Sequence, residues 1–171
     1  MTVKDTYGDV AVTRLDGHVI QCEIQRPPNN FFDIALINDL SDCFEDIDQD
    51  QDFRAIVLCS DGKHFCAGAN FGSSERAAEL EKRTDSDRNP LYDQAVRLFR
   101  CKKPVVAAVQ GAAVGGGFGL ALMADFRVVC PATRMTANFV KLGFTPGFGL
   151  THTLARIVGV QRANLLFMTG R

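Results

Sequence analysis

The sequence predicts a single α/β domain with a mostly parallel sheet, and three observations support this. Short apolar runs rich in β-branched residues begin at Arg54, Val105 and Phe126, a pattern typical of strands buried on both faces. Helical patterns lie between these runs and after them. Strands that alternate with helices favour parallel pairing through right-handed crossovers. The length of 171 residues suits one domain over residues 1–171 with a substantial core.

The amino-terminal part predicts a hairpin followed by a helix. Residues 10–15 and 18–24 alternate in polarity on either side of Asp16-Gly17, a two-residue turn signal. Asp33 is a suitable N-cap, and apolar residues recur behind it at helical spacing until about Gln49.

The middle of the chain predicts a strand, two loops and another helix. The strand covers 54–60 and leads into a loop of small residues over 63–70. Residues 72–88 are polar and rich in charge, with at most a short helix over 75–82. An amphipathic helix then carries Leu91, Ala95 and Leu98 on one face.

The last third predicts three strands, two loops and three helices. The expected elements are a strand over 105–109, a glycine loop over 111–117, a helix over 118–123, a buried strand over 126–130, a turn over 131–133, a short strand over 135–138, a Gly/Pro loop over 143–149, and helices over 150–157 and 162–168.

Composition excludes several classes of function. The net charge of −1, with Lys and Arg dispersed among Asp and Glu, gives no basis for binding nucleic acid or an anionic membrane. The six cysteines show no C-x-x-C pairing and the three histidines no metal-ligand spacing, so we expect free thiols and no metal. The amino terminus lacks the apolar region of a signal peptide. The sequence therefore predicts a cytoplasmic protein.

Gly115-Gly116-Gly117 is the most informative local pattern. It lies where a buried strand passes into a helix, so backbone N–H groups and the positive end of the helix dipole face whatever binds there. Glycines also let a ligand approach the backbone without meeting a Cβ. The pattern predicts a site for negative charge, permanent or transient. It fits neither the dinucleotide nor the phosphate-loop spacing.

Four motifs in order resemble the enoyl-CoA hydratase/isomerase (crotonase) superfamily. They are Arg26-Pro-x-x-Asn-x-Phe, residues 61–70 (DGKHFCAGAN), residues 103–125 around the glycine triplet, and Lys141-Leu-Gly-Phe-Thr-Pro-Gly147. The resemblance implies a spiral of ββα units and assembly as a trimer or dimer of trimers. It also implies C-terminal helices that this chain lacks, so we expect the domain to be C-terminally incomplete.

The resemblance further implies an acyl-CoA thioester as the substrate, with no cofactor other than the coenzyme A that it carries. The thioester carbonyl would lie between the backbone N–H groups of Ala69 and Gly116. Two preorganised donors there would stabilise an enolate or a tetrahedral intermediate. The residues expected around the substrate are Arg26, Ala67, Gly68, Asn70, Gly115, Gly119 and Phe139.

The sequence departs from the family pattern at the catalytic carboxylates. The two glutamates of the family's hydratases correspond here to Gly119 and Phe139, and an aspartate of other members corresponds to Gly147. Asn70 stands where many members have an aspartate. General acid–base catalysis by positioned side chains contributes roughly 10²–10⁴-fold. We therefore expect little hydration of a double bond.

Another residue could supply the base. The candidates are His64, His152, and Glu75 or Glu79 in the polar segment. A surface or structural role fits both histidines better than that of a base, since neither has an identifiable carboxylate partner. Cys66 fits a packed thiol better than a nucleophile, and Phe139, Phe144 and Phe148 are candidates to line an acyl pocket or to pack the core.

Three functional hypotheses follow. The first is an enzyme of the hydratase/isomerase type, a lyase or isomerase of fatty acid metabolism, whose reaction depends on an unassigned base. The second is a non-catalytic binder of CoA esters. The third is an unrelated α/β interaction domain, which a failure to bind any CoA ester would favour.

Overall fold

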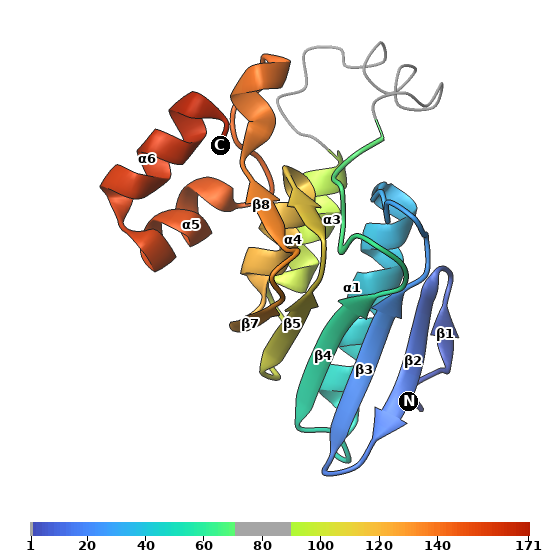
Figure 1. The fold of residues 1–171 in the computed structure, drawn as a ribbon. Coiled ribbons are helices and arrows are strands. Elements are labelled where there is room, and N and C mark those ends of the chain that lie inside the picture. Colours follow the sequence, from blue (N-terminus) through green and yellow to red (C-terminus); the bar gives the residue numbers. More distant parts are fainter. Residues whose placement is uncertain (1, 71–89) are drawn as a thin grey trace.

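The computed structural model describes residues 2–70 and 90–171 and has an α/β architecture (Figure 1). Its large sheet has the strand order β1-β2-β3-β4-β5-β7, and β6 pairs with β8 in a second sheet. The strands are β1 (Thr6–Tyr7), β2 (Val10–Leu15), β3 (Val19–Ile24), β4 (Ala55–Ser60), β5 (Val105–Val109), β6 (Ala112–Val114), β7 (Phe126–Val129) and β8 (Arg134–Thr136). The helices are α1 (Ile34–Gln49), α3 (Pro90–Leu98), α4 (Gly116–Met123), α5 (Leu150–Val158), α6 (Val160–Thr169) and the 3₁₀ helix η1 (Asn138–Leu142).

The parallel part of the sheet is confirmed. Strands β3, β4, β5 and β7 pair in parallel, while β1, β2 and β3 pair antiparallel. The predicted hairpin is present, but its connection contains three residues instead of two, because Leu15 pairs with Val19. Gly17 and His18 both take positive φ there, 73° and 65°.

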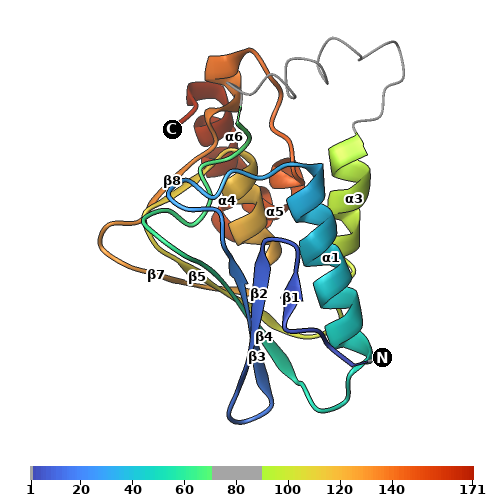
Figure 2. The same ribbon diagram turned by 90° about the vertical axis from the view of Figure 1, so that its right-hand side faces the viewer.

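Helix α1 begins as the sequence predicts. The Asp33 side chain accepts a hydrogen bond from the Leu36 N–H at 2.9 Å, which satisfies one of the unpaired donors of the first turn. Helices α1 and α3 lie side by side against one face of the large sheet (Figure 2). The apolar face of α1 is fully buried in the main core: Leu36, Ile37, Leu40, Phe44 and Ile47.

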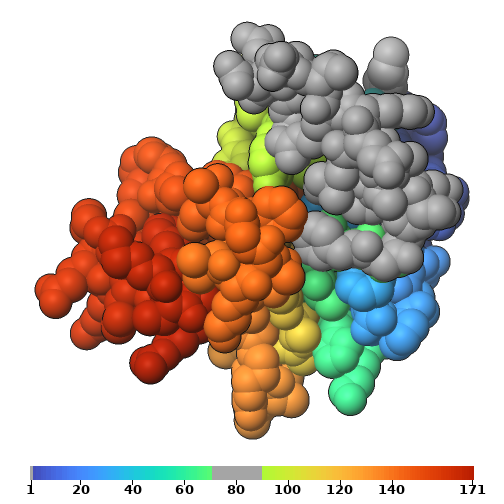
Figure 3. Space-filling view, turned by 90° about the horizontal axis from the view of Figure 1, so that it is seen from above, coloured from blue at the N-terminus to red at the C-terminus, as the bar shows by residue number. Residues whose placement is uncertain are grey.

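The glycine segment contains more regular structure than predicted. Residues 112–114 form strand β6, and α4 already begins at Gly116. Helices α5 and α6 project from the side of the sheet body (Figures 1 and 3). They pack with α4 around a second apolar cluster, which contains Phe118, Leu122, Ala137, Leu150, Leu154 and Ala163.

The prediction that the strand over 126–130 is buried is wrong. Phe126, Val128 and Val129 of β7 are 65%, 62% and 57% exposed. Strand β7 is an edge strand, and in the described part of the chain its only sheet neighbour is β5. An apolar run predicts a strand, but it does not say whether a neighbouring element covers it.

The short helix expected over 75–82 lies outside the residues that the structure describes. No helix among residues 2–70 and 90–171 is long and apolar enough to cross a membrane.

Candidate active site

Two loops at the carboxyl ends of β4 and β5 lie against each other. The Cys66 N–H donates to the Ala112 carbonyl at 3.0 Å, and the Val114 N–H donates to the Cys66 carbonyl at 3.0 Å. Cys66 and Ala113 thereby form an isolated parallel bridge. The loop after β4 is thus fixed beside the strand that leads into α4.

One amide of the first loop has no backbone acceptor among the described residues. The Ala67 N–H donates to the Asn29 carbonyl at 2.9 Å, and the Gly68 carbonyl accepts from the Phe32 N–H at 3.1 Å. The Ala69 N–H, next along the loop, donates to no backbone carbonyl of the described residues.

The start of α4 contains a second amide of this kind. The Gly115 N–H donates to the Thr136 carbonyl at 2.9 Å, whereas the Gly116 N–H has no backbone acceptor within the described chain. This amide is in the first turn, where the helix dipole adds positive potential. At Gly117 a Cβ would lie 2.8 Å from the Cys66 carbonyl carbon, so a glycine is needed for the helix to approach the first loop this closely.

Both amides border one cavity of about 300 Å³. Its described walls come from both loops, α3, η1 and the segment after η1, and they are mostly apolar. They are Phe32, Ala67, Gly68, Ala69, Leu91, Tyr92, Val114, Gly115, Gly116, Asn138, Phe139, Leu142, Phe144 and Thr145. None of these is Asp, Glu, His, Lys or Arg, so the described walls carry no charged side chain.

The cavity includes most of the predicted site residues but not all. Ala69 and Gly116 are among its walls, with Ala67, Gly68, Gly115 and Phe139. Arg26, Asn70 and Gly119 are not. The Arg26 guanidinium instead forms ion pairs with Asp9 at 2.6 Å and Asp33 at 2.8 Å.

The structure also shows what fills two of the three positions without a carboxylate. A Cβ on Gly119 would lie 2.7 Å from the Cβ of Phe148, whose ring is buried between Phe32 and Phe99 at centroid distances of 5.6 and 6.2 Å. A Cβ on Gly147 would overlap the hydroxyl oxygen of Tyr92. Aromatic side chains therefore occupy the space next to both glycines.

Neither candidate histidine lies in the cavity wall. His64 Nδ1 accepts a hydrogen bond from the Ala112 N–H at 3.1 Å, so the ring holds the first loop against β6. His152 lies on α5 within 3.5 Å of Arg156. Burial raises the pKa of the Cys66 thiol to about 12, which keeps it protonated and inert. Glu75 and Glu79 lie outside the described residues.

The buried side chain of Asn30 holds the first loop in place. Asn30 is fully buried; its Nδ2 donates to the carbonyls of Asp61 at 2.7 Å and His64 at 2.6 Å, and its Oδ1 accepts from the Arg26 N–H at 2.9 Å. The sequence marked Asn30 as part of a motif but gave it no role. In the structure it ties the segment after β3 to the loop that carries Ala69.

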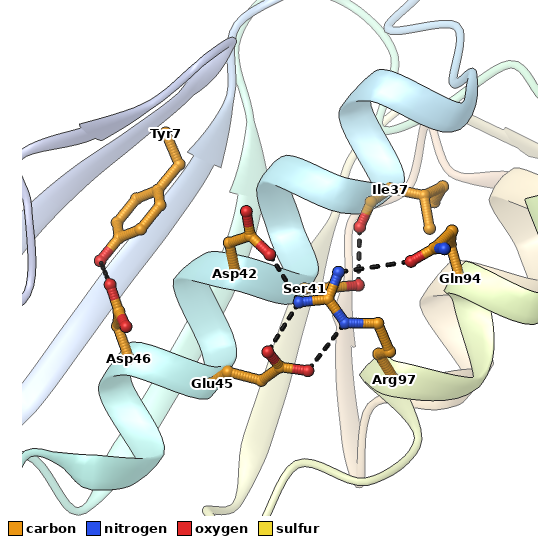
Figure 4. Close-up of polar contacts among 8 residues, drawn as sticks. All are labelled: Tyr7, Ile37, Ser41, Asp42, Glu45, Asp46, Gln94 and Arg97. Atoms are coloured by element: carbon orange, nitrogen blue, oxygen red, sulfur yellow. Dashed lines mark hydrogen bonds and ion pairs between the residues drawn. The ribbon is translucent and has the colours of Figure 1, made fainter.

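An ionic contact holds α3 against α1 (Figure 4). Helix α3 contributes Leu91 and Tyr92 to the cavity. Arg97 on α3 donates to Glu45 at 2.6 and 2.8 Å and to Asp42 at 2.5 Å, both on α1. The sequence analysis missed Tyr92, because a tyrosine beside the buried Leu91 gives no signal of a cavity.

The described residues hold no cluster of three or more His, Cys, Asp or Glu side chains that could bind a metal ion.

Comparison with known proteins places this chain in a family. The family model for Enoyl-CoA hydratase/isomerase matches residues 14–171. The chain is 38% identical over 162 residues to "Probable enoyl-CoA hydratase EchA14" of Mycobacterium tuberculosis. The matched region covers 93% of this chain and 62% of that protein. It is 33% identical over 165 residues to the "Bacillaene synthase decarboxylase PksI" of Bacillus subtilis, and that match covers 95% of this chain and 64% of the relative.

Solved structures agree. An enoyl-CoA hydratase from Bacillus anthracis superimposes with a TM-score of 0.81 at 29% identity, over 95% of this chain and 63% of that one. The chain therefore spans a little under two thirds of the length of these relatives. With a match over residues 14–171, it belongs to the enoyl-CoA hydratase/isomerase family, and its fold is the crotonase fold.

Proposed function

We propose that this chain acts on an acyl-CoA thioester whose carbonyl oxygen accepts hydrogen bonds from the N–H groups of Ala69 and Gly116. One observation carries the proposal. These two amides, from loops far apart in the sequence, both border the same cavity and have no backbone acceptor in the described part of the chain. Unpaired amides at a cavity wall cost free energy unless a ligand or water satisfies them.

Such a pair suits reactions that place negative charge on the carbonyl oxygen. An enolate and a tetrahedral intermediate both do so, and each preorganised donor can contribute about 2.7–4 kcal/mol to the transition state. The helix dipole of α4 adds to this at Gly116. Ala67, Gly68, Gly115 and Phe139 surround the acyl group in this proposal.

We propose a reaction that does not use the family's usual pair of glutamates, because Gly119 and Phe139 stand at those two positions. The relatives' names cover more than hydration, since one is a hydratase and another a decarboxylase. The exact reaction of this chain, its assembly as a trimer or dimer of trimers, and a cytoplasmic location remain predictions. The same absence of carboxylates favours a second candidate, a homologue that binds CoA esters without turnover.

A change in the ligand tests the two amides without disturbing the fold. Butyryl-CoA has the carbonyl oxygen, while its thioether analogue S-butyl-CoA lacks it. Two neutral hydrogen bonds contribute about 1–3 kcal/mol, so we expect the thioether to bind roughly 5- to 150-fold more weakly by calorimetry. Equal affinities would contradict the proposal. Turnover of any acyl-CoA in a panel, followed by mass spectrometry, separates the enzyme from the non-catalytic binder.

A further inference from the structure

A polar side chain borders the cavity beside the two amides. Asn138 is the first residue of η1 and one of the described walls. The residue is partly buried, and its carboxamide forms no hydrogen bond with the described part of the chain. Polar groups that are withdrawn from solvent normally have a hydrogen-bond partner, so this carboxamide is available to a bound ligand.

The backbone fixes Asn138 next to the start of α4. Strand β8 pairs in parallel with β6, with Thr136 opposite Val114. The Gly115 N–H donates to the Thr136 carbonyl at 2.9 Å, which continues this contact past the ends of both strands. The two residues that follow Thr136 and the first residues of α4 are therefore held side by side.

The carboxamide itself lies against Gly115. A Cβ on Gly115 would lie 3.1 Å from Asn138 Oδ1 and 3.7 Å from Cζ of Phe139. Gly115 is also a cavity wall, and it directly precedes the Gly116 amide. Phe139, at the position of a family glutamate, contributes only a ring here, so the polar side chain beside this amide is the neighbouring Asn138.

The chemistry of the ligand limits what Asn138 can bind. A carboxamide donates and accepts hydrogen bonds, but it is neutral and is not a base. In an acyl-CoA thioester, the strong acceptor next to the Gly116 amide is the carbonyl oxygen, since thioester sulfur accepts weakly and the α-carbon carries only C–H bonds. Rotation about the Cβ–Cγ bond of Asn138 brings its Nδ2 donor to the place of Oδ1. An enolate oxygen has three lone pairs, so it can accept from a third donor.

We propose that the Asn138 Nδ2–H is a third donor to the thioester oxygen, in addition to the N–H groups of Ala69 and Gly116. This rests on the proposed function and adds a side chain to its two backbone donors. The bond becomes charge-assisted once the oxygen is negative. Asn138 therefore stabilises an enolate or a tetrahedral intermediate more than the bound thioester.

Two ligands and three variants test this donor. Calorimetry gives the affinities for butyryl-CoA and for S-butyl-CoA, which lacks the carbonyl oxygen. Asn138→Leu removes the donor at similar size. We expect it to weaken butyryl-CoA by about two- to tenfold, the range for one neutral hydrogen bond, and to leave S-butyl-CoA unchanged. Asn164→Leu is the matched control, because Asn164 is exposed on α6 and is not among the described walls; it should change neither affinity.

Asn138→Asp keeps the shape of the side chain and makes its polarity depend on pH. At pH 7 the introduced carboxylate only accepts, so butyryl-CoA should again be weakened selectively, at least as much as by Asn138→Leu. A protonated carboxyl can donate, and apolar surroundings raise the pKa of a carboxyl. The preference for butyryl-CoA should therefore recover in this variant as the pH falls to about 5, relative to the wild type at the same pH.

The outcomes separate this inference from the proposed function. Asn138→Leu or Asn138→Asp proteins that lose affinity for both ligands equally, or for neither, overturn the third donor while the wild type still prefers butyryl-CoA. A preference in Asn138→Asp that does not change with pH would also overturn it. If the wild type binds the two ligands equally, the amide pair and the proposed function fail.

Discussion

The contact between Gly119 and Phe148 predicts a measurable coupling between these two positions. A Cβ added at Gly119 would lie 2.7 Å from Phe148 Cβ and 2.9 Å from its Cδ1, closer than real Cβ contacts allow. Phe148 is 2% exposed, so its ring has little room to move. Overpacking of this kind costs about 1–3 kcal/mol, and the better helix propensity of alanine offsets about 0.5–1 kcal/mol of it.

We therefore expect Gly119→Ala to lower the free energy of unfolding by about 1–2 kcal/mol, which corresponds to a Tm decrease of roughly 2–8 °C for a domain of this size. In a Phe148→Gly background both clashing side-chain atoms are gone, and only the backbone oxygen of residue 148, 2.9 Å from the added Cβ, is left as a close contact. Phe148→Gly alone should cost about 3–5 kcal/mol as a lost buried aromatic. This loss is reduced by relief of the positive φ of 52° at that residue. In this background Gly119→Ala should lower the free energy of unfolding by less than it does in the wild type, because only the backbone contact is left.

Urea denaturation of the wild type, Gly119→Ala, Phe148→Gly and the double variant gives the coupling energy between the two positions. We expect this coupling energy to be at least about 1 kcal/mol. Additivity within about 0.5 kcal/mol would show that Phe148 does not exclude a side chain at position 119. The result also bears on catalysis. Introducing the family's two glutamates as Gly119→Glu and Phe139→Glu should fail to produce hydration of crotonyl-CoA unless Phe148 is also reduced in size.

Three further outcomes follow from the described contacts. Arg97→Met should destabilise the protein by about 1–2 kcal/mol at low salt, because it removes contacts to Asp42 and Glu45 that are partly exposed. The hydrogen bond from Arg97 lowers the pKa of the Glu45 carboxyl in the folded protein. The loss of unfolding free energy in Arg97→Met should therefore be complete above the unfolded pKa of 4.5 and disappear as the pH falls through the lower folded pKa. A loss that persists in acid would refute this. Asn30→Asp should lower the free energy of unfolding, measured by urea denaturation, by about 3 kcal/mol or more, because it turns a donor to two carbonyls into an acceptor. A loss under about 1 kcal/mol would show that these hydrogen bonds contribute little to stability. With a thiol reagent at pH 7, the exposed Cys130, whose pKa is lowered mainly by its hydrogen bond with Thr133, should react first, and Cys66 only on unfolding; a fast phase that survives Cys130→Ser would contradict this order.

The sequence predicted those parts of the fold that depend on local pattern. The period of apolar residues and the cap at Asp33 located α1, and the β-branched runs located β4 and β5. Exposure of β7 was not predictable, because it depends on which element covers the strand and not on the strand's own residues. Strand β6 was missed for a related reason. Its pairing with β8 joins residues about 20 positions apart, and three residues carry no periodic signal.

For the candidate site, the sequence located both amide loops through their small residues, and the cavity brings these loops together. It also showed that the usual carboxylates are absent. It did not show what replaces them, because that depends on contacts between distant segments: Phe148 against Gly119, and Tyr92 against Gly147.

These two contacts share a physical logic. In each, an aromatic side chain from another segment lies where a side chain on the glycine would begin. Close packing disfavours empty space in a core, so loss of a side chain in one segment favours a larger one beside it. Under the proposed function, glycines in place of carboxylates at positions 119 and 147 leave out negative charge that would repel a developing oxyanion. Under the proposed function, charge stabilisation in this site therefore depends on the amides of Ala69 and Gly116, which border the cavity.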